Sequence, residues 1–524
     1  MKMKTRYALI AALMGGSLTA AAQETYMNAE LATGDLNGTA RYVGMGGAMD
    51  ALGADLSTIG TNPAGIGLFR HSMASASFGF VSQQDAVKFA DANKTNMSFD
   101  QIGFVYSMRT SSRSFINFAF NYHKSRNFNF ILNAAGNLGA DASQNKASYN
   151  KGAAAADSGW DFVYPDNGYI TSGDNAFSQL DELYYNALLV APGSDMSNPT
   201  YGYFGAERYM MDRKNSGYIG SYDFNISGNI NDRVYLGVTI GLHDVHYKGY
   251  SEYAELFAPN EEQVDGVLVE DTREITGSGV DVKAGVIFRP IEESPFRIGL
   301  SVATPTWYDL TTRNYTAMVV DDKLNGQYSM DISNEYDFKL YTPWKFGLSL
   351  GHTIDRYLAL GASYEYADYG STDSRVIDGY DWDGYEDTSS DREMNRHTEK
   401  TLKGVHTVKV GAEFKPDNDI SVRLGFNYLS PMYNKNAVKD GWLDSYGVSY
   451  ASSTDYTNWK DTYRITAGIG YRIDKFSIDL AYQYSQTNGT FRPFSDVLDA
   501  TNTADAVDVS NKRHQMLLSL GYTF

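Results

Sequence analysis

The chain ends with the sequence QMLLSLGYTF, residues 515–524, and this stretch decides the fold class. Large apolar residues stand at every second position from Met516 to Phe524, and the positions between them are small or polar, apart from Leu517. This period of two with one apolar face is typical of a β-strand. The pattern recurs many times upstream. Strands cross a membrane only in a closed barrel, because an unpaired backbone amide is costly in hydrocarbon.

The repeated pattern predicts an all-β fold, a fourteen-stranded antiparallel transmembrane β-barrel. Short connections alternate with long ones, as expected for short periplasmic turns and long extracellular loops, and the longest predicted loop covers 132–213. The alternative is a soluble β-sandwich or propeller, which does not explain the apolar faces. The predicted strands are 72–83, 98–109, 113–131, 214–231, 233–252, 270–289, 295–312, 334–354, 356–371, 399–416, 419–431, 459–473, 475–488 and 511–524.

Composition excludes several classes of protein. The 524 residues include no cysteine, so disulfides and thiolate chemistry are impossible. The net charge of −19 argues against nucleic acid as a partner. A mean hydropathy of −0.38 is too polar for a bundle of membrane helices. The 40 tyrosines suit the aromatic girdles of a barrel. We expect no cofactor, no metal and no catalytic residue.

The first residues have the features of a secretory signal peptide. Lys2, Lys4 and Arg6 precede a short apolar run, and a small-residue site at 20–22 precedes Gln23. We therefore predict a signal peptide at 1–22 and the outer membrane of a Gram-negative bacterium as the location.

Charged residues occupy the non-apolar faces of the predicted strands. An Arg or Lys facing lipid at the midplane costs about 2–4 kcal/mol, so these side chains should point into the lumen. Two interpretations stay open: a solvated lumen of paired charges, or cations that hold a plug or a substrate carboxylate. The predicted lumen cations are Arg297, Lys345, Lys409, Arg423 and Arg464.

The segment 23–71 before the first strand does not alternate and is rich in Gly and Ala. Small residues permit close backbone packing, and Asn62-Pro63 fixes a turn. This composition predicts a compact plug inside the barrel, which then covers 72–524. The run Gly44-Met45-Gly46-Gly47 is not a nucleotide loop, because no strand precedes it and no Lys-Ser/Thr follows it.

The run Asn62-Pro63-Ala64-Gly65, with the stretches 304–308 and 342–346, resembles the FadL-type outer-membrane transporters of long-chain fatty acids and other hydrophobic compounds, in the style of a Bacteroidota member. The resemblance implies a fourteen-stranded barrel with an N-terminal hatch, and it places Asn62-Pro63-Ala64 in that hatch. It also implies ligand capture by extracellular loops, hatch rearrangement and lateral exit beside a kinked third strand. The predicted third strand has no glycine, so the polar run 123–127 is the candidate for the opening.

The long segment 132–213 contains Phe177, Leu180, Tyr184 and Leu188 near helical spacing. Two interpretations stay open. The first is a small helix that caps the barrel. The second is an apolar groove that captures a hydrophobic ligand, with the predicted loop 313–333 as its other wall.

The sequence therefore predicts passive uptake of hydrophobic small molecules. We expect Asn62, Pro63, Ala64 and Gly65 to gate the path. We expect the hatch acids Asp50 and Asp55 to face lumen cations such as Arg297, Arg423 or Arg464. The expected partners are the ligand, outer-membrane lipids and lipopolysaccharide, and the barrel assembly machinery through the strand ending at Phe524; the chain should be a monomer.

Two other functions remain possible from the sequence. One is a non-selective porin or a structural barrel such as a surface antigen. The other is an outer-membrane hydrolase, although no paired nucleophile and base is visible and His243 and His246 should fall on opposite faces of one strand.

Overall fold

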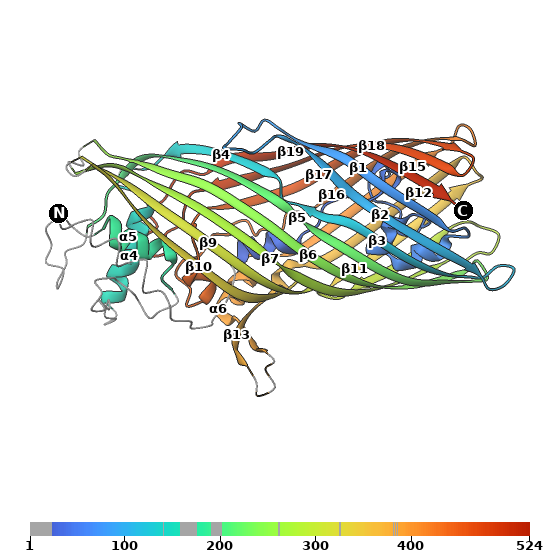
Figure 1. Ribbon diagram of the computed structural model, residues 1–524, viewed down its shortest axis with the longest axis horizontal. Coiled ribbons are helices and arrows are strands. Elements are labelled where there is room, and N and C mark those ends of the chain that lie inside the picture. The colour runs from blue at the N-terminus through green and yellow to red at the C-terminus, as the bar shows by residue number, and fades with distance from the viewer. Residues whose placement is uncertain are drawn as a thin grey trace.

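A computed structural model describes residues 24–139, 141–157, 176–189, 202–259, 263–323, 326–380, 382, 384 and 386–524. The predicted signal peptide lies outside the described residues. The described chain forms one antiparallel sheet that closes on itself, because β1 pairs with both β2 and β19 (Figure 1).

Within these residues the sheet has nineteen strands, and five consecutive pairs of them each form one strand of the wall. These pairs are β3 with β4, β8 with β9, β10 with β11, β12 with β13, and β14 with β15. The barrel therefore has fourteen strands, which confirms the predicted architecture. The strands are β1 Met73–Gln84, β2 Thr95–Arg109, β3 Phe115–Asn127, β4 Phe130–Asn137, β5 Ala206–Ile230, β6 Val234–Phe257, β7 Val264–Phe288, β8 Arg297–Ala303, β9 Trp307–Asp322, β10 Gly326–Tyr341, β11 Lys345–Ile354, β12 Leu358–Asp368, β13 Asp373–Tyr380, β14 Glu386–Ser390, β15 Gly404–Phe414, β16 Ile420–Leu429, β17 Tyr456–Ile473, β18 Phe476–Arg492 and β19 Val507–Thr523.

Several wall strands run further than the sequence predicted. The predicted loop 313–333 is wrong, because β9 and β10 continue through most of it and pair from Trp307↔Tyr341 to Asp322↔Gly326. The predicted loop 132–213 likewise loses both ends to β4 and β5. Alternation weakens in these extensions, because their outer faces are polar, so the apolar period of two no longer marks them.

Prolines in the stretches 304–308 and 342–346 explain why two of the wall strands are each interrupted. Pro305 separates β8 from β9, and Pro343 separates β10 from β11. Proline has no N–H to donate to a ladder, so a strand is interrupted where it stands.

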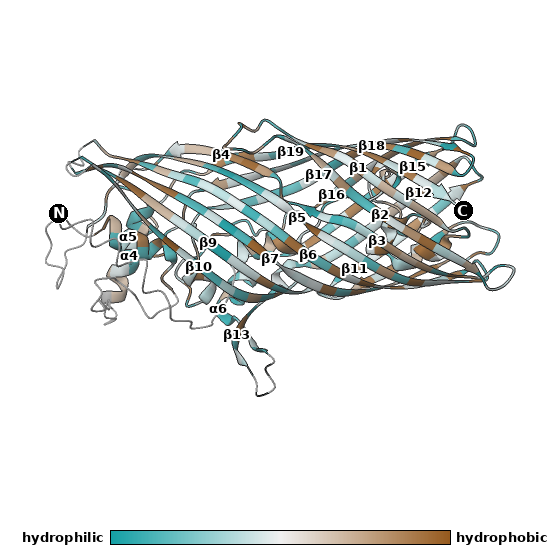
Figure 2. Cartoon of the chain, in the orientation of Figure 1, coloured by the Kyte–Doolittle hydropathy of each residue, from teal (hydrophilic) through white to brown (hydrophobic). Residues whose placement is uncertain are grey.

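Apolar side chains cover the outside of the barrel at the end that carries the short turns (Figure 2). On β19, Met516, Leu518 and Leu520 are exposed, whereas Leu517 and Ser519 between them are buried inside. This alternation is the one read from the sequence, and it places the lipid-facing band. No helix among the described residues is long and apolar enough to span a bilayer.

The segment 24–69 lies inside the barrel and forms the hatch (Figure 1). Its elements are α2 Thr25–Ala32, α3 Ala40–Gly44, η1 Leu56–Gly60 and η2 Pro63–Leu68. Further helices gather at the long-loop end, the opposite end from the short turns, or lie beside it: α4 Gln144–Asp157, α5 Gln179–Ala187, η3 Tyr369–Ser371, α6 Arg392–Thr401 and α7 Tyr446–Ser449. The barrel is thus filled at one end and covered at the other.

Candidate functional site

The hatch meets the wall through η2. The Asn62 side chain accepts a hydrogen bond from the Ala64 N–H at 3.2 Å and so caps this short helix. Pro63 occupies the first helical position, where its missing N–H has no cost. Asn62 is fully buried, and its amide packs on Gly285 of β7 and Gly299 of β8. The predicted motif is therefore a wall contact of the hatch.

One of the two predicted hatch acids faces a predicted lumen cation, although not one of the three arginines named as examples. Asp50 accepts a hydrogen bond from Thr61 at 2.5 Å and lies 3.8 Å from Lys409 Nζ. Asp55 is bonded inside the hatch, where it accepts from the Ser57 N–H at 2.9 Å and from Thr39. Neither acid pairs with Arg297, Arg423 or Arg464. The Asp50 carboxylate accepts from the Thr61 hydroxyl instead, and the Asp55 carboxylate caps η1 and accepts from Thr39.

The predicted lumen cations have several different partners. Arg297 donates to the Leu52 carbonyl of the hatch at 2.9 Å. Arg423 pairs within the wall, with Glu413 at 2.7 Å and Asp479 at 2.6 Å. Glu413 also forms an ion pair with Arg41 of α3 at 3.0 Å. The sequence did not predict this hatch cation, because Arg41 lies outside the strands. Lys345, Lys409 and Arg464 line the cavity described below.

The four predicted capture residues lie in the packed interior of a cap. Phe177, Leu180, Tyr184 and Leu188 are all buried in one apolar cluster with Val320 and Ile332 of the β9–β10 hairpin and with residues of α4 and β18. A capping box of Ser178 and Asp181 begins α5. The open capture groove is therefore wrong for these side chains, and the cap interpretation holds. The hairpin does form the facing wall, since Gln179 donates to the Ile332 carbonyl at 3.0 Å.

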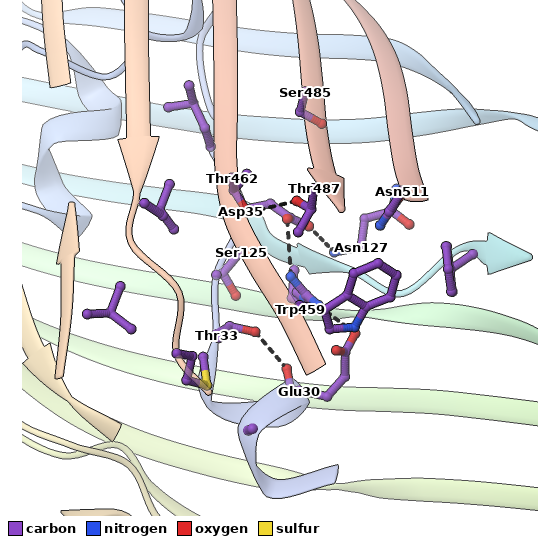
Figure 3. Close-up of a pocket in the computed structure, with 18 of the residues that line it drawn as sticks. Glu30, Thr33, Asp35, Ser125, Asn127, Trp459, Thr462, Ser485, Thr487 and Asn511 are labelled. Carbon is purple, nitrogen blue, oxygen red and sulfur yellow. Dashed lines mark hydrogen bonds and ion pairs between the residues drawn. The ribbon is translucent and has the colours of Figure 1, made fainter. Parts of the chain in front are cut away.

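A cavity of about 480 Å³ lies between the hatch and the cap. Figure 3 shows one part of it, where Trp459, Thr462, Thr487 and Asn511 face the hatch residues around Asp35. Aromatic and apolar side chains share its lining with many charged ones. The apolar members include Met27, Phe130, Leu132, Met432, Tyr433 and Trp459. Such a lining suits a molecule with both apolar and charged parts better than a pure hydrocarbon.

The wall beside this cavity has a gap between β2 and β3. The two strands pair from Arg109↔Phe115 only as far as Gln101↔His123, although β2 begins at Thr95 and β3 continues to Asn127. A register shift between Lys124 and Arg126 interrupts the pairing with β5 as well. The predicted polar run 123–127 thus coincides with an unpaired strand edge in the wall.

The hatch segment after α2 covers this edge. The Asp35 N–H donates to the Ser125 carbonyl at 2.8 Å, and the Asn127 N–H donates to Asp35 Oδ2 at 2.9 Å. The Asn37 amide bridges the gap, because it donates to Asp100 of β2 at 2.9 Å and to the Lys124 carbonyl of β3 at 3.0 Å. Sequence analysis missed both residues, since no motif marks them.

Among the described residues, a serine, a histidine and an aspartate lie in a row on the wall. Ser221 Oγ lies 2.9 Å from His243 Nδ1, and His243 Nε2 lies 2.9 Å from Asp281. Asp281 also pairs with Lys283 at 2.8 Å. Ser221 is buried and is not among the residues that line the cavity, although Asp281 is.

No model of a protein family matches this sequence, and neither does any curated protein. Solved structures do match. A Pseudomonas aeruginosa FadL homologue has a TM-score of 0.51 and 13% identity, with 94% of this chain and all (100%) of that chain covered. The Ralstonia pickettii toluene transporter TbuX has a TM-score of 0.49 and 12% identity, over 93% of this chain and 99% of that chain. The chain therefore has the fold of the FadL-type transporters.

Proposed function

We propose that this barrel takes up hydrophobic small molecules that carry an anionic group, such as long-chain fatty acids, through the outer membrane. The observation that carries the proposal is a cavity inside the barrel whose lining includes Lys124 and Ser125, at the gap in the wall. A hydrophobic molecule that leaves sideways through such a gap enters lipid without crossing water, which an axial pore does not allow. The shared fold and the exposed apolar band support the location in the membrane.

The path begins at the long-loop end and ends at the gap. Opening requires the cap to part and the hatch segment at Asp35 and Asn37 to leave the β3 edge. No nucleotide or redox step is needed, because partition of apolar surface between phases supplies the driving force at roughly 25 cal/mol per Å². Asn62, Pro63, Ala64 and Gly65 would hold the rest of the hatch in place, and this is their proposed gating role.

Closing the gap tests the proposal. The ring of Phe99, in the unpaired part of β2, stacks on the ring of Tyr122 at the end of the paired ladder, with centroids 5.8 Å apart, so this pair borders the gap. The chain has no cysteine, so the pair Phe99→Cys and Tyr122→Cys can be joined by a short cleavable thiol-reactive linker. We expect crosslinking to abolish uptake of labelled palmitate by whole cells and cleavage of the linker to restore it.

A matched pair lies in the intact part of the same ladder. Phe104 and Phe120 are directly opposite each other, with ring centroids 6.1 Å apart. Crosslinking Phe104→Cys to Phe120→Cys should leave uptake unchanged. If both crosslinks lower uptake equally, or neither does, exit through the gap is refuted.

A polar-solute porin is the second candidate, and the charged lining of the cavity favours it. The two functions differ in the solutes that they would transport. A porin would pass small polar solutes with the gap crosslinked, because its path runs along the axis.

A further inference from the structure

One hatch carboxylate, that of Asp35, lies where three arginines of the wall converge. Arg126 Nη1 is 3.3 Å from Asp35 Oδ1, and Arg464 Nη2 is 4.0 Å from the same oxygen. Burial alone would raise the pKa of Asp35, but Arg126, Arg513 and Arg464 together hold this pKa below its ordinary value. The site is therefore an anion site that the protein itself occupies.

The three arginines have hydrogen-bond donors that the surrounding carboxylates do not use. Among the described residues, Arg513 donates to the backbone carbonyls of Asn127 at 3.2 Å and Asn129 at 2.6 Å and forms no ion pair with a carboxylate. The buried Nε atoms of Arg126 and Arg513 have no hydrogen-bond partner among these residues. Three guanidinium groups thus face two carboxylates, those of Asp35 and of Glu30, which lies 2.5 Å from Arg126.

The same carboxylate also closes the gap. Asp35 Oδ2 accepts the Asn127 N–H while Asp35 Oδ1 faces the arginines. One side chain is therefore shared between the anion site and the unpaired edge of β3 (Figure 3). Whatever removes this carboxylate from the arginines also removes an acceptor from that edge.

We propose that Asp35 is a built-in substitute for the anionic head group of the transported molecule, which displaces Asp35 from the three arginines and so frees the β3 edge. This inference rests on the proposed uptake function and adds how the ligand opens the gap. Carboxylates, sulfates and phosphates bind arginine with the same forked geometry, so each can replace the side chain. A ligand anion and the Asp35 carboxylate do not occupy the same position on the arginines, because like charges at contact distance repel.

The apolar part of the molecule has a place beside the site. Trp459 packs edge-on against Phe130, with ring centroids 5.7 Å apart, and both line the cavity with Arg126 and Arg513. A head group on the arginines leaves an alkyl chain against these rings, where it is removed from water.

Binding of two probes that differ only in the head group tests the inference. Dodecanoate and dodecanol are titrated against the purified full-length barrel in a non-ionic detergent. Asp35→Asn keeps an oxygen for the Asn127 N–H but removes the competing charge. We expect it to raise the affinity for dodecanoate by about tenfold, because the site is no longer self-occupied, and to leave dodecanol unchanged.

Two variants serve as controls. Asp309→Asn removes a carboxylate that pairs with Lys339 at 3.1 Å, and neither residue lines the cavity, so it should alter neither affinity. Arg513→Gln removes a cation of the site and should weaken dodecanoate alone. In the unmodified chain, dodecanoate but not dodecanol should speed hydrogen exchange at the Asn127 amide, a readout that a purely structural Asp35 would not give.

The binding results distinguish failure of the Asp35 inference from failure of the uptake function. If dodecanol and dodecanoate bind but Asp35→Asn leaves or lowers the dodecanoate affinity, the inference is overturned and the uptake function stands. If neither probe binds the unmodified chain or its variants, the uptake function and the inference fall together.

Discussion

At the scale of the residue, the hatch and the wall fit because both use the smallest side chains at their contacts. A methyl group at Gly285 would overlap Asn62 Oδ1, and one at Gly361 would overlap the Ala48 carbonyl. The backbones of the hatch and the wall therefore come into direct contact, without long side chains between them. The small residues thus serve close backbone packing, as the sequence predicted for the hatch.

Replacing Gly285 should therefore dislodge the hatch. We expect Gly285→Ala to increase hydrogen exchange at the amides of η2, because the new methyl group and the Asn62 amide cannot occupy one place. Gly228→Ala is the control, since its nearest neighbour, the Phe115 carbonyl oxygen, is 3.9 Å from the added carbon. Equal exchange in the two variants would contradict the packing argument.

Removing the Asn62 side chain should weaken the hatch and leave the barrel intact. Asn62→Ala loses the cap of η2, a change that costs about 1 kcal/mol in helices generally. We expect lower palmitate uptake but unchanged heat-modifiable mobility on electrophoresis, which reports barrel assembly. Normal uptake with a destabilised η2 would argue against the gating role.

At the scale of the element, α2 is tied to the wall by charge. Glu24 lies immediately before α2 and is buried against Lys439 at 2.6 Å and Arg273 at 3.3 Å. Burial would raise the pKa of Glu24, but Lys439 and Arg273 lower it further than burial raises it. The carboxylate is therefore more stable in the folded hatch than in an unfolded one.

This pairing gives α2 a defined pH dependence. Its stabilisation is complete above the ordinary carboxyl pKa of 4.5 and is lost as the pH falls through the lowered value of the folded state. We expect the protection of the α2 amides, corrected for the intrinsic pH dependence of exchange, to stay constant above pH 4.5 and to fall below it. Glu24→Gln should remove most of this dependence, and an identical pH profile in that variant would contradict the assignment.

The cap is an element held by apolar burial. Leu180 is 1% exposed in the cluster between α5 and the β9–β10 hairpin. Leu180→Ala should destabilise the cap by about 2–5 kcal/mol, because a cavity replaces the side chain. Faster proteolysis within the cap, with the barrel still resistant, is the expected result; Glu182→Gln on the same helix is the control.

At the scale of the whole molecule, the barrel is closed along its axis by two independent parts. The hatch fills the short-turn end and the cap covers the long-loop end, with the cavity between them. A fourteen-stranded cylinder is wide enough to conduct ions once emptied. Closure along the axis and a gap in the side are what distinguish this barrel from an open pore.

Single-channel recording measures that closure. We expect the intact chain to conduct little in a planar bilayer, and a variant lacking 24–69 to conduct at least about tenfold more, since it leaves a wide lumen. Heat-modifiable mobility confirms that the shortened barrel has folded. A large conductance of the intact chain would favour the porin.

The sequence by itself determined the barrel, because lipid on one side and water on the other impose a period of two that is local to each strand. Residues 515–524 show it completely, and the small residues near Asn62 mark the hatch for a similar local reason. The extensions of β9 and β10 were missed, because water on their outer face removes the apolar half of the pattern.

Only the tertiary structure decided the site. Asp35, Arg126, Arg464 and Arg513 come from the hatch and from three strands far apart in the chain, and no spacing relates them. The gap lies where the β2–β3 pairing stops at His123, next to the register shift between Lys124 and Arg126 in the β3–β5 pairing. Charge convergence and strand register are properties of the closed cylinder, and they exist only once its ends have met.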